Sequence, residues 1–439
     1  MITGIKIFTD LGPGDGGKGG VIAAECARNQ TTCVIKRGGA QGSHGVKTRQ
    51  GKEFNFSQWG CGTLFGIPTF LSEQMVIMPV GLKNEANALG KIGVEKPFDL
   101  ISADPDCICA TPFHRISSRL EELLRKEDPR GTIGTGVGQA FRMYQNLDDS
   151  MTIRAHELTN AIKVRSKLKK QLDYYRDLYA EITPSSGLPE DAEYFSEVLD
   201  LLWDEGYLDH IVETFSFVGK KLKIQELNGV LKTQNGTAIV ECSHGVLTDS
   251  AKGFKPHTSA IRTLPKFTEQ MLRDAGYEGY ICHYGVHRAY EIRHGAGPMP
   301  TYDQSLTEKM LPGSHKETNR WQGKVRAGAL DINLLRYANE VCRETDFSGI
   351  CLTWFDQIMK NRSWPICTRY QEAKQPHDEI VSYVEKAKPG IMVLPLTGPL
   401  NRTSMFELAD RVVQQYLGVP LYSLSFGPTE CDKIYSRRR

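Results

Sequence analysis

The chain has 439 residues, 40% of them hydrophobic, which is enough for one large α/β domain or for two or three domains of average size. Its 54 Lys and Arg residues nearly balance its 52 Asp and Glu residues, so it lacks the basic excess with which general nucleic-acid binders displace counterions. Because no stretch approaches the roughly 20 apolar residues of a membrane-spanning helix, and because the N-terminus lacks the layout of a signal peptide, we expect a cytoplasmic protein that binds neither nucleic acid nor a membrane.

Short apolar runs between glycine-rich turns predict the strands. Several are rich in β-branched residues and almost wholly apolar, as in strands that helices cover on both faces. They comprise residues 5–9, 33–36, 75–79, 237–241, 349–353 and 421–425. Helices are predicted at residues 20–28, 117–126, 157–180 and 406–416. The pattern predicts an α/β fold with a large, mostly parallel central sheet flanked by helices.

The middle of the chain is predicted to be helical. Residues 157–180 carry cations at nearly every exposed turn, which is typical of a solvated helix face. Together with residues 189–207, they belong to a helical excursion, roughly residues 142–230, between two parts of the sheet. No internal repeat or Ser/Pro-rich linker divides the chain, so we expect residues 1–439 to form a single domain.

The first loop, LGPGDGGKGG, directly follows the strand at 5–9. Gly12, Gly17 and Lys18 have the GxxxxGK spacing of a phosphate-binding loop, in which backbone N–H groups close around phosphate oxygens at a helix N-terminus. Lys18 would add a positive charge at the β/γ-phosphates. Gly19 stands where an ordinary P-loop has a Ser or Thr hydroxyl for magnesium. The alternative is a merely tight strand-to-helix turn.

Asp15 lies inside this loop. An acid there would repel phosphate unless a divalent cation or a proton transfer uses it. The alternative is that Asp15 caps the helix that follows.

The second loop, RGGAQGSHGV, follows the strand at 33–36. Its glycines let the backbone approach a ligand, and His44 brings a side chain whose ordinary pKa lies near neutrality. A lone His is usually structural. Loops after two strands of a parallel sheet lie at its carboxyl edge, however, where such folds bind ligands, and this favours a functional role for His44.

The two loops resemble those of the adenylosuccinate synthetase family. That family has a G-D-E-G-K-G loop followed by G-G-x-N-x-G-H, and the counterparts here are GDGGKG at 14–19 and GGAQGSH at 38–44. Six further segments are similar to family motifs in the same order: GTIGTGVGQAF (131–141), ECSHGVLTD (241–249), RHGAGPMPT (293–301), GKVRAGALD (323–331), SGICLTWFD (348–356) and LGVPLYSLSFGP (417–428). The resemblance covers nearly the whole chain and implies one catalytic domain with a P-loop-like site.

The resemblance implies a magnesium-dependent C–N ligase that forms a homodimer and works in two steps. Asp15 takes the N1 proton of a 6-oxopurine nucleoside monophosphate so that O6 attacks the γ-phosphate of a nucleoside triphosphate, and His44 is the acid. The amine of L-aspartate then displaces phosphate from C6. Lys18 clamps phosphate, and Asp15 and the Ser43 carbonyl hold Mg²⁺. The phosphate-binding glycines are Gly14, Gly16, Gly17, Gly19 and Gly42.

The resemblance also assigns residues to three ligands. The donor nucleotide is assigned to Trp354, Asp356, Ser425 and Gly427. The acceptor nucleotide is assigned to Gln41, Thr132, Ile133, His244, Thr258 and His294. The carboxylates of aspartate are assigned to Lys324 and Arg326.

Departures from the family pattern leave the substrates open. Asp356 keeps the carboxylate that reads guanine, but Trp354 replaces a Lys and either stacks on a base or belongs to the core, so GTP and ATP are both candidate donors. Four residues around the acceptor are replaced: Gln41, Ile133, His244 and His294. The acceptor is therefore IMP, which Asp15 favours, or (d)GMP, as in phage-type relatives that make the succinylated precursor of 2-aminoadenine.

A non-ligase nucleotide-binding paralogue or triphosphatase is the alternative from another class. Trp321 and Gln322 replace the T-T of the family's aspartate loop, which favours this alternative. Asp15, Lys18 and His44 together favour the ligase, because a mere binder needs neither an acid nor a base.

Three histidines close in sequence, His283, His287 and His294, include an i, i+4 pair with the spacing of metal ligands on a helix. The segment resembles a strand of the family, in which residues four apart lie about 13 Å from each other. We therefore predict a strand here and assign no metal to these three residues.

Overall fold

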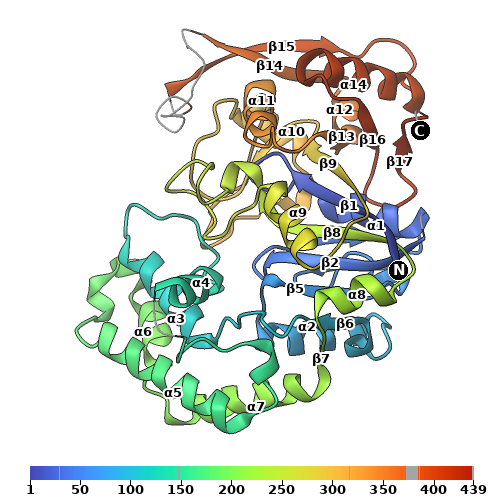
Figure 1. Cartoon of the computed structure of the whole chain (residues 1–439). Coiled ribbons are helices and arrows are strands. Elements are labelled where there is room, and N and C mark those ends of the chain that lie inside the picture. Colours follow the sequence, from blue (N-terminus) through green and yellow to red (C-terminus); the bar gives the residue numbers. More distant parts are fainter. Residues whose placement is uncertain (29, 147–148, 316, 372–383, 385, 438–439) are drawn as a thin grey trace.

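A computed structural model describes residues 1–28, 30–146, 149–315, 317–371, 384 and 386–437. Within them lies a ten-stranded sheet in which every neighbouring pair is parallel except β16 and β17 at one edge (Figure 1). In spatial order the strands are β17 (Lys433–Tyr435), β16 (Leu421–Ser425), β13 (Phe347–Thr353), β9 (Tyr280–Arg288), β1 (Ile2–Asp10), β8 (Gly236–Gly245), β2 (Thr31–Gly39), β5 (Thr69–Val76), β6 (Ile101–Ala103) and β7 (Lys223–Ile224). The predicted large, mostly parallel sheet is confirmed.

Helices cover both faces of the sheet, which is why its strands are apolar throughout. Phe8 of β1 packs in one core with Val21 of α1 (Lys18–Arg28). Ile7, on the opposite face of β1, packs in another core with Leu231 of α8 (Leu227–Thr233) and Met271 of α9 (Pro265–Asp274). Burial on both faces makes these strands read as continuous apolar runs instead of alternating ones.

The predicted helices correspond to α1, α3 (Pro112–Leu124), α5 (Ala161–Leu178) and α14 (Arg402–Leu417). Five of the six predicted strands also lie within observed ones. The strand predicted at residues 75–79 is wrong in its bounds, because β5 ends at Val76 and Pro79 begins α2 (Pro79–Lys91). Proline has no N–H for a strand ladder and fits the first turn of a helix.

The helical part lies between β6 and β7, at the lower left of Figure 1. It contains α3, α4 (Val137–Asn146), α5, α6 (Ala192–Asp200) and α7 (Glu205–Lys221), and so begins earlier in the chain than residue 142. Leu168, Phe195 and Phe215 of these helices belong to the same buried cluster as Phe8 and Val34 of the sheet. The helices and the sheet therefore share one continuous core.

Three smaller sheets and three more helices complete the described part of the chain. Two strand pairs are β3 (His44–Lys47) with β4 (Glu53–Phe56) and β10 (Glu291–Arg293) with β11 (Arg326–Gly328). A three-stranded sheet contains β12 (Leu330–Asp331), β14 (Ser363–Gln371) and β15 (Lys388–Pro395). The helices are α10 (Gln304–Met310), α11 (Ile332–Val341) and α12 (Phe355–Asn361).

The strand order brings the motifs of the sequence to one edge. Strands β13, β9, β1, β8 and β2 are consecutive neighbours and run in the same direction. The loops that follow them carry residues 11–17, 40–43, 246–264, 289–300 and 354, so these segments meet at the carboxyl edge of the sheet. Within the described residues, no helix combines the length and apolarity needed to cross a bilayer.

Candidate active site

The first loop joins β1 to α1 and turns sharply. Gly14, Asp15 and Gly17 all have positive φ, at 112°, 57° and 85°. The Thr353 hydroxyl donates to the Gly16 carbonyl at 2.7 Å, which fastens the loop to the end of β13. A Cβ at Gly17 would lie 2.7 Å from that hydroxyl oxygen, so only glycine fits at this position. The loop is therefore held in one shape by β13 and by its own glycines.

Asp10, the last residue of β1, lies at the centre of this loop. The N–H of Gly12 donates to its Oδ1 at 2.9 Å, and the N–H of Gly16 donates to its Oδ2 at 2.8 Å. Lys18 Nζ donates to the same Oδ2 at 2.9 Å and to the carbonyl of His244 at 3.0 Å. Burial alone would raise the pKa of Asp10, but Lys18 and the backbone donors hold that pKa below its ordinary value. Asp10 was not predicted from the sequence, because an acid at the end of a strand has no spacing that marks it.

One carboxylate oxygen of Asp15 lies close to an arginine and two histidines. Its Oδ2 lies 2.7 Å from Arg288 Nη2, 2.9 Å from His294 Nε2 and 3.4 Å from His315 Nε2. Burial opposes ionisation, yet Arg288 and the imidazoles hold the pKa of Asp15 well below its ordinary value. The side chain thus points across the site toward β9 and the following loops. The side chain of Asp15 makes these contacts instead of capping α1, which was the alternative interpretation.

Arg288 is the fixed member of this cluster. Its side chain is only 1% exposed, and its Nε donates to the backbone carbonyl of Asp15 at 2.6 Å. The donor atoms of Asp15, His294 and His315 lie within 4.8 Å of one another, close enough to share a metal ion. Because the Arg288 guanidinium already contacts Asp15 Oδ2, its positive charge would repel a metal ion at that oxygen. Neither Arg288 nor His315 was predicted from the sequence.

His283 and His287 lie on β9, as the resemblance predicted. His283 Nε2 lies 3.1 Å from Glu269, and His287 Nε2 lies 3.3 Å from Glu291. The two imidazoles therefore contact different carboxylates. His294 belongs instead to the cluster around Asp15.

His44 begins β3 and is oriented by a buried carboxylate. Its Nδ1 lies 2.6 Å from Glu241 Oε1, which also accepts from Lys36 Nζ at 2.8 Å. The N–H of Cys61 donates to the other oxygen of Glu241 at 2.8 Å. Burial lowers the pKa of His44, with Lys36 and Lys18 adding to that effect and Glu241 opposing it. With Nδ1 on the carboxylate, Nε2 is the nitrogen left for a reacting group.

Glu241 itself stays ionised. Burial would raise its pKa, but Lys36, His44 and the N–H of Cys61 hold that pKa far below its ordinary value. Glu241 opens the motif at 241–249, but no pattern in the sequence singled it out as the partner of His44.

The loops carrying these residues touch. A Cβ at Gly19 would lie 2.5 Å from the carbonyl oxygen of Gly45 and 3.1 Å from the carbonyl carbon of His44. Gln41 Nε2 contacts His244 Nε2, and Lys18 reaches the carbonyl of His244. The structure therefore brings together the predicted residues Lys18, Gln41, His44 and His244. Asp15 lies on the β9 side of the first loop, and the partners of His44 lie on its β2 and β8 side.

Trp354 packs against the Asp15 cluster. The Arg288 guanidinium carbon lies 4.3 Å from the centre of its ring, and His315 lies edge-on at 5.6 Å. The residue is half-buried with φ 59° and caps the start of α12. Nearby Asp356 is half-buried, and burial raises the pKa of its carboxyl. Ser425 is buried at the end of β16, and Gly427 follows it.

The residues assigned to the acceptor nucleotide and to the substrate L-aspartate include members of two further loops. A Cβ at Gly131 would lie 2.9 Å from the Cα of Gly295, so the loop of Thr132 and Ile133 adjoins the loop of His294. Arg326 Nη2 donates to the carbonyls of Gly295 and Gly297 at 2.8 and 2.9 Å, and so orders that second loop. Ile133 is 40% exposed. Lys324 and Ser43 are exposed, and Thr258 is half-buried.

The chain is similar to known proteins over nearly its whole length. The family model for adenylosuccinate synthetase matches residues 11–430. The adenylosuccinate synthetase of Marinomonas sp. (strain MWYL1) is 25% identical over 97% of this chain and 96% of its own. That of Halothermothrix orenii is also 25% identical, over 98% of each chain.

Two solved structures share the fold. Fully ligated adenylosuccinate synthetase from Plasmodium falciparum matches with a TM-score of 0.80 and 18% identity, over 98% of this chain and 99% of its own. The succinoaminodeoxyadenylate synthetase of cyanophage S-2L, solved with dGMP and with dATP as an energy donor, matches with a TM-score of 0.59 and 15% identity, over 99% and 96%. Both likenesses concern the fold.

Proposed function

The chain belongs to the adenylosuccinate synthetase family and is a C–N ligase of purine nucleotide biosynthesis; from this premise we propose that it joins L-aspartate to IMP through a 6-phosphoryl intermediate made from GTP or ATP. One observation carries the proposal: the first loop holds an ionised carboxylate, Asp15, paired with Arg288, and the segment that adjoins α1 at Gly19 holds a carboxylate-oriented imidazole, His44.

In the first step, Asp15 accepts the N1 proton of the purine. The electron pair freed at N1 lets O6 attack the γ-phosphorus, so the O6–P bond forms and the bond from phosphorus to the β-bridging oxygen breaks. The nucleoside diphosphate leaves with that electron pair. Arg288 keeps Asp15 ionised and ready to accept the proton. Lys18 and the loop N–H groups stabilise the charge that develops on the phosphoryl oxygens.

His44 acts on the purine side of the same step. The Glu241 carboxylate accepts from Nδ1–H and fixes the ring, so Nε2 would donate to the developing oxyanion from the imidazolium form, which Glu241 favours and burial opposes. This division of roles needs one group that starts ionised and one that carries a proton. The lowered pKa of Asp15 supports the first role, and the contact of His44 Nδ1 with the Glu241 carboxylate supports the second, because that carboxylate stabilises the imidazolium.

In the second step, the amine of aspartate attacks C6. The C6–N bond forms, the C6–O bond breaks, and phosphate leaves, because O6 is a good leaving group only after phosphorylation. Lys324 and Arg326 would hold the aspartate carboxylates. Arg326 also orders the turn behind His294, which lies next to Asp15.

Mg²⁺ would be held by Asp15 and the carbonyl of Ser43. The side chain of Asp15 is 34% exposed, so its carboxylate could reach a magnesium ion that is bound with the substrate phosphates. One carboxylate oxygen beside substrate phosphates is an ordinary magnesium site. Bound there, the ion neutralises negative charge on the transferred phosphoryl group. The glycines at 14, 16, 17, 19 and 42 would shape the same phosphate site.

The donor base would lie near Trp354, Asp356, Ser425 and Gly427. The Arg288 guanidinium stacks on the ring of Trp354, the residue that replaces the family's lysine. Asp356 suits guanine, and Trp354 suits either purine, so GTP and ATP are both proposed. The protein would work in the cytoplasm as a homodimer.

The acceptor would contact Gln41, Thr132, Ile133, His244, Thr258 and His294. The second acceptor proposed is (d)GMP, which would give the N6-succinyl-2-amino product. Two imidazoles support this option, His244 against Gln41 and His294 against Asp15, because they change the polar groups that would surround the base. The shared fold with a phage enzyme solved with dGMP points the same way.

A nucleotide-binding paralogue without ligase activity is the second candidate. Trp321, in the altered aspartate loop, packs edge-on to Tyr194 at 5.7 Å, so this loop is tied to α6 by an aromatic contact. A loop held in this way is less able to close over an amino acid.

A substrate matrix tests the proposal. Each purine monophosphate, IMP, GMP and dGMP, is incubated with ATP or GTP, L-aspartate and Mg²⁺, and products are identified by mass. We expect a succinylated nucleotide from IMP, and its appearance from GMP or dGMP alone would replace the acceptor. Phosphate release without any succinylated product, in every combination, would establish the paralogue instead.

A further inference from the structure

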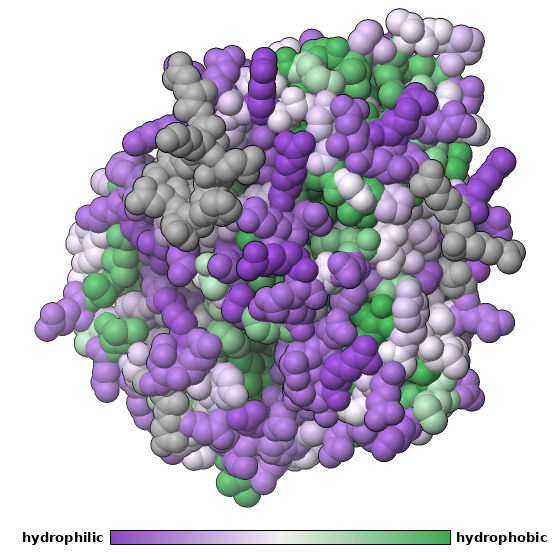
Figure 2. Space-filling view, turned by 45° about the horizontal axis from the view of Figure 1, so that its top comes forward, coloured by the Kyte–Doolittle hydropathy of each residue, from purple (hydrophilic) through white to green (hydrophobic). Residues whose placement is uncertain are grey.

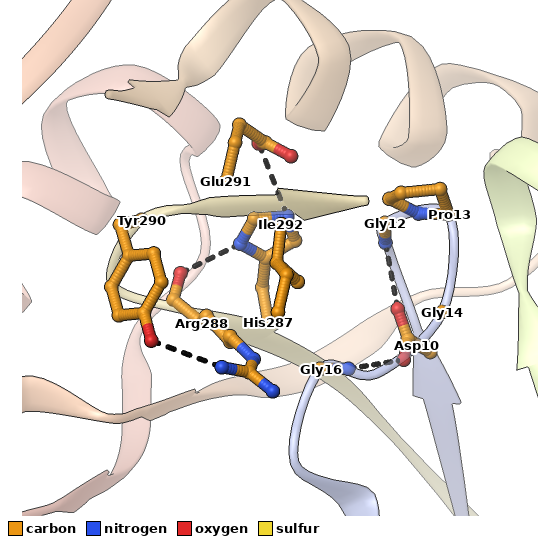
Figure 3. A pocket seen from close by; sticks show the side chains of 10 residues that line it. All are labelled: Asp10, Gly12, Pro13, Gly14, Gly16, His287, Arg288, Tyr290, Glu291 and Ile292. Atoms are coloured by element: carbon orange, nitrogen blue, oxygen red, sulfur yellow. Dashed lines mark hydrogen bonds and ion pairs between the residues drawn. The ribbon is translucent and has the colours of Figure 1, made fainter. Parts of the chain in front are cut away.

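The donors that the first loop would offer to phosphate already contact a carboxylate of the protein. The N–H groups of Gly12 and Gly16 point at the two oxygens of Asp10, which lies beneath the loop (Figure 3). Lys18 joins them at 2.9 Å. A P-loop wraps its N–H groups and its lysine around a phosphate, and here they wrap around Asp10.

The pair is fully enclosed. The carboxylate of Asp10 is completely buried, and the side chain of Lys18 is 2% exposed. The backbone of Gly12 and Gly14 and the Asp10 carboxylate all press against Gly245, where a Cβ would not fit. The carboxylate therefore has no room to swing away toward β8. Any phosphate at this loop must bind while Asp10 stays in place.

Lys18 is left with one donor for a phosphate. An ammonium has three N–H groups, and those of Lys18 already serve Asp10 Oδ2 and the carbonyl of His244. The charge of Asp10 also offsets the charge of Lys18 and repels a phosphate oxygen directly. The loop consequently holds less net positive charge than its GxxxxGK sequence implies.

We propose that Asp10 is an internal counter-anion that lowers the affinity of this loop for phosphate. Asp10 fixes Lys18 in place and limits how tightly the loop holds the phosphate groups of donor and product. Its role is that of a positioning and affinity-determining residue, since it acts through Lys18, Gly12 and Gly16. The proposal rests on the proposed function in one respect, which is that the loop binds the triphosphate.

The test measures binding of inorganic pyrophosphate to the full-length protein by calorimetry, without Mg²⁺ and with a chelator. Asp10→Asn removes the charge at nearly constant size. We expect it to lower the Kd for pyrophosphate by about 10-fold or more, since one unit charge acts at contact distance. Without pyrophosphate, we expect the Tm of this variant to lie below the wild-type Tm, because Lys18 is buried without its carboxylate. Added pyrophosphate should raise the Tm of the variant more steeply than that of the wild type, because the anion then pairs with Lys18.

Glu157→Gln is the matched control. The Glu157 carboxylate pairs with Lys167 Nζ at 2.9 Å, far along the chain in the helical part, and is also buried. This control should lose Tm in the same way, while its pyrophosphate affinity should equal that of the wild type. A merely structural role for Asp10 would make the two variants behave alike.

The outcomes separate this inference from the proposed function. If Asp10→Asn binds pyrophosphate no more tightly than the wild type does, the inference is wrong, even where the wild type ligates normally. If the wild type binds neither pyrophosphate nor a magnesium–triphosphate, the proposed function fails first. A variant that folds only when pyrophosphate is present supports the inference. Asp10→Asn and the smaller Asp10→Ser both failing to fold, with and without pyrophosphate, would overturn it.

Discussion

The Asp15 carboxylate contacts three positive or polar side chains, and its removal should separate the chemical step from nucleotide binding. Asp15→Asn keeps the size of the side chain but cannot accept a proton at N1. We expect ligation to fall by at least about 10²-fold, the usual scale for a lost general base. The Kd for the triphosphate should change only a few-fold, because Lys18 and its own partners are untouched. Product mass and calorimetry measure the two effects.

A matched control for Asp15 is Asp173→Asn. Asp173 is an exposed carboxylate that pairs with Lys169 on α5, so its loss should change neither quantity. Turnover that survives in Asp15→Asn would show that another group takes the proton.

Glu241 supports His44 and Lys36 together, and Glu241→Gln leaves both without a charged partner. A buried ammonium without its carboxylate typically costs about 3–5 kcal/mol of unfolding free energy. We therefore expect unfolding in urea at a clearly lower midpoint, and loss of ligation in the fraction that stays folded. Glu157→Gln should show a similar midpoint with normal ligation. Equal activity of the two variants would remove His44 from the mechanism.

At the scale of elements, the approach of α1 to β3 determines where His44 lies. Gly19 and Gly20 are neighbours in α1, yet a Cβ at Gly19 would lie 2.5 Å from the Gly45 carbonyl, whereas a Cβ at Gly20 would meet nothing closer than 3.5 Å. Gly19→Ala should push β3 away and reduce kcat strongly. Gly20→Ala should raise the unfolding free energy by about 0.5–1 kcal/mol, as alanine does in a helix. Steady-state kinetics and urea unfolding of both variants check this, and a fully active Gly19→Ala would contradict it.

The start of α11 carries a second prediction. Asp331 caps this helix by accepting from the N–H groups of Asn333 and Leu334, and burial with the nearby Glu291 raises the pKa of Asp331 to about 7. A raised pKa favours the folded state most at low pH, and that contribution is lost as pH rises through 7. Asparagine caps a helix as well as aspartate does and carries no charge. Asp331→Asn should therefore raise the urea midpoint at pH 8 more than at pH 5, and an equal change at both pH values would contradict it.

Strands were predictable where burial on both faces makes the sequence continuously apolar, as at residues 5–9. Helices were predictable where burial of one face makes the apolar residues periodic, as at residues 406–416. The loops at 14–19 and 38–44 were predictable because glycine, lysine and histidine have few uses at such spacing. Glu241, Arg288 and His315 were not, because each acts through a partner far away in the chain. Asp10 was not either, because an acid at the end of a strand has no spacing that marks it. Arg326 shows the same limit: its type suggested a carboxylate ligand, and its observed contacts are backbone carbonyls.

For the molecule as a whole, paired carboxylates should set its response to acid. Asp10, Asp15 and Glu241 all have a lowered pKa, and that of Glu157 falls to about 2 despite its burial, through Lys163 and Lys167. A lowered pKa gives stability that is present above the unfolded pKa, near 4, and lost as pH falls toward the folded value. We expect the unfolding free energy to drop steeply between about pH 4.5 and pH 2. A free energy that stays level from pH 5 to pH 3 would contradict these pairings.

The face shown in Figure 2 is mostly hydrophilic, with apolar side chains in small separate patches. Some large apolar side chains remain exposed, and two of them, Ile162 and Trp203, belong to the helical part. The stability of the molecule therefore depends on the shared interior core and on its buried charge pairs.

The position of β1 has a consequence for biosynthesis. Strand β1 is synthesised before its two neighbours in the sheet, β8 and β9, which begin only at Gly236 and Tyr280. Until those segments emerge, the nascent chain exposes both hydrogen-bonding edges of β1, and such edges invite pairing with other chains. Chaperone binding during translation should therefore concentrate on nascent chains that end before β9, and the phosphate loop should become able to bind a ligand only after β8, β9 and β13 have been synthesised.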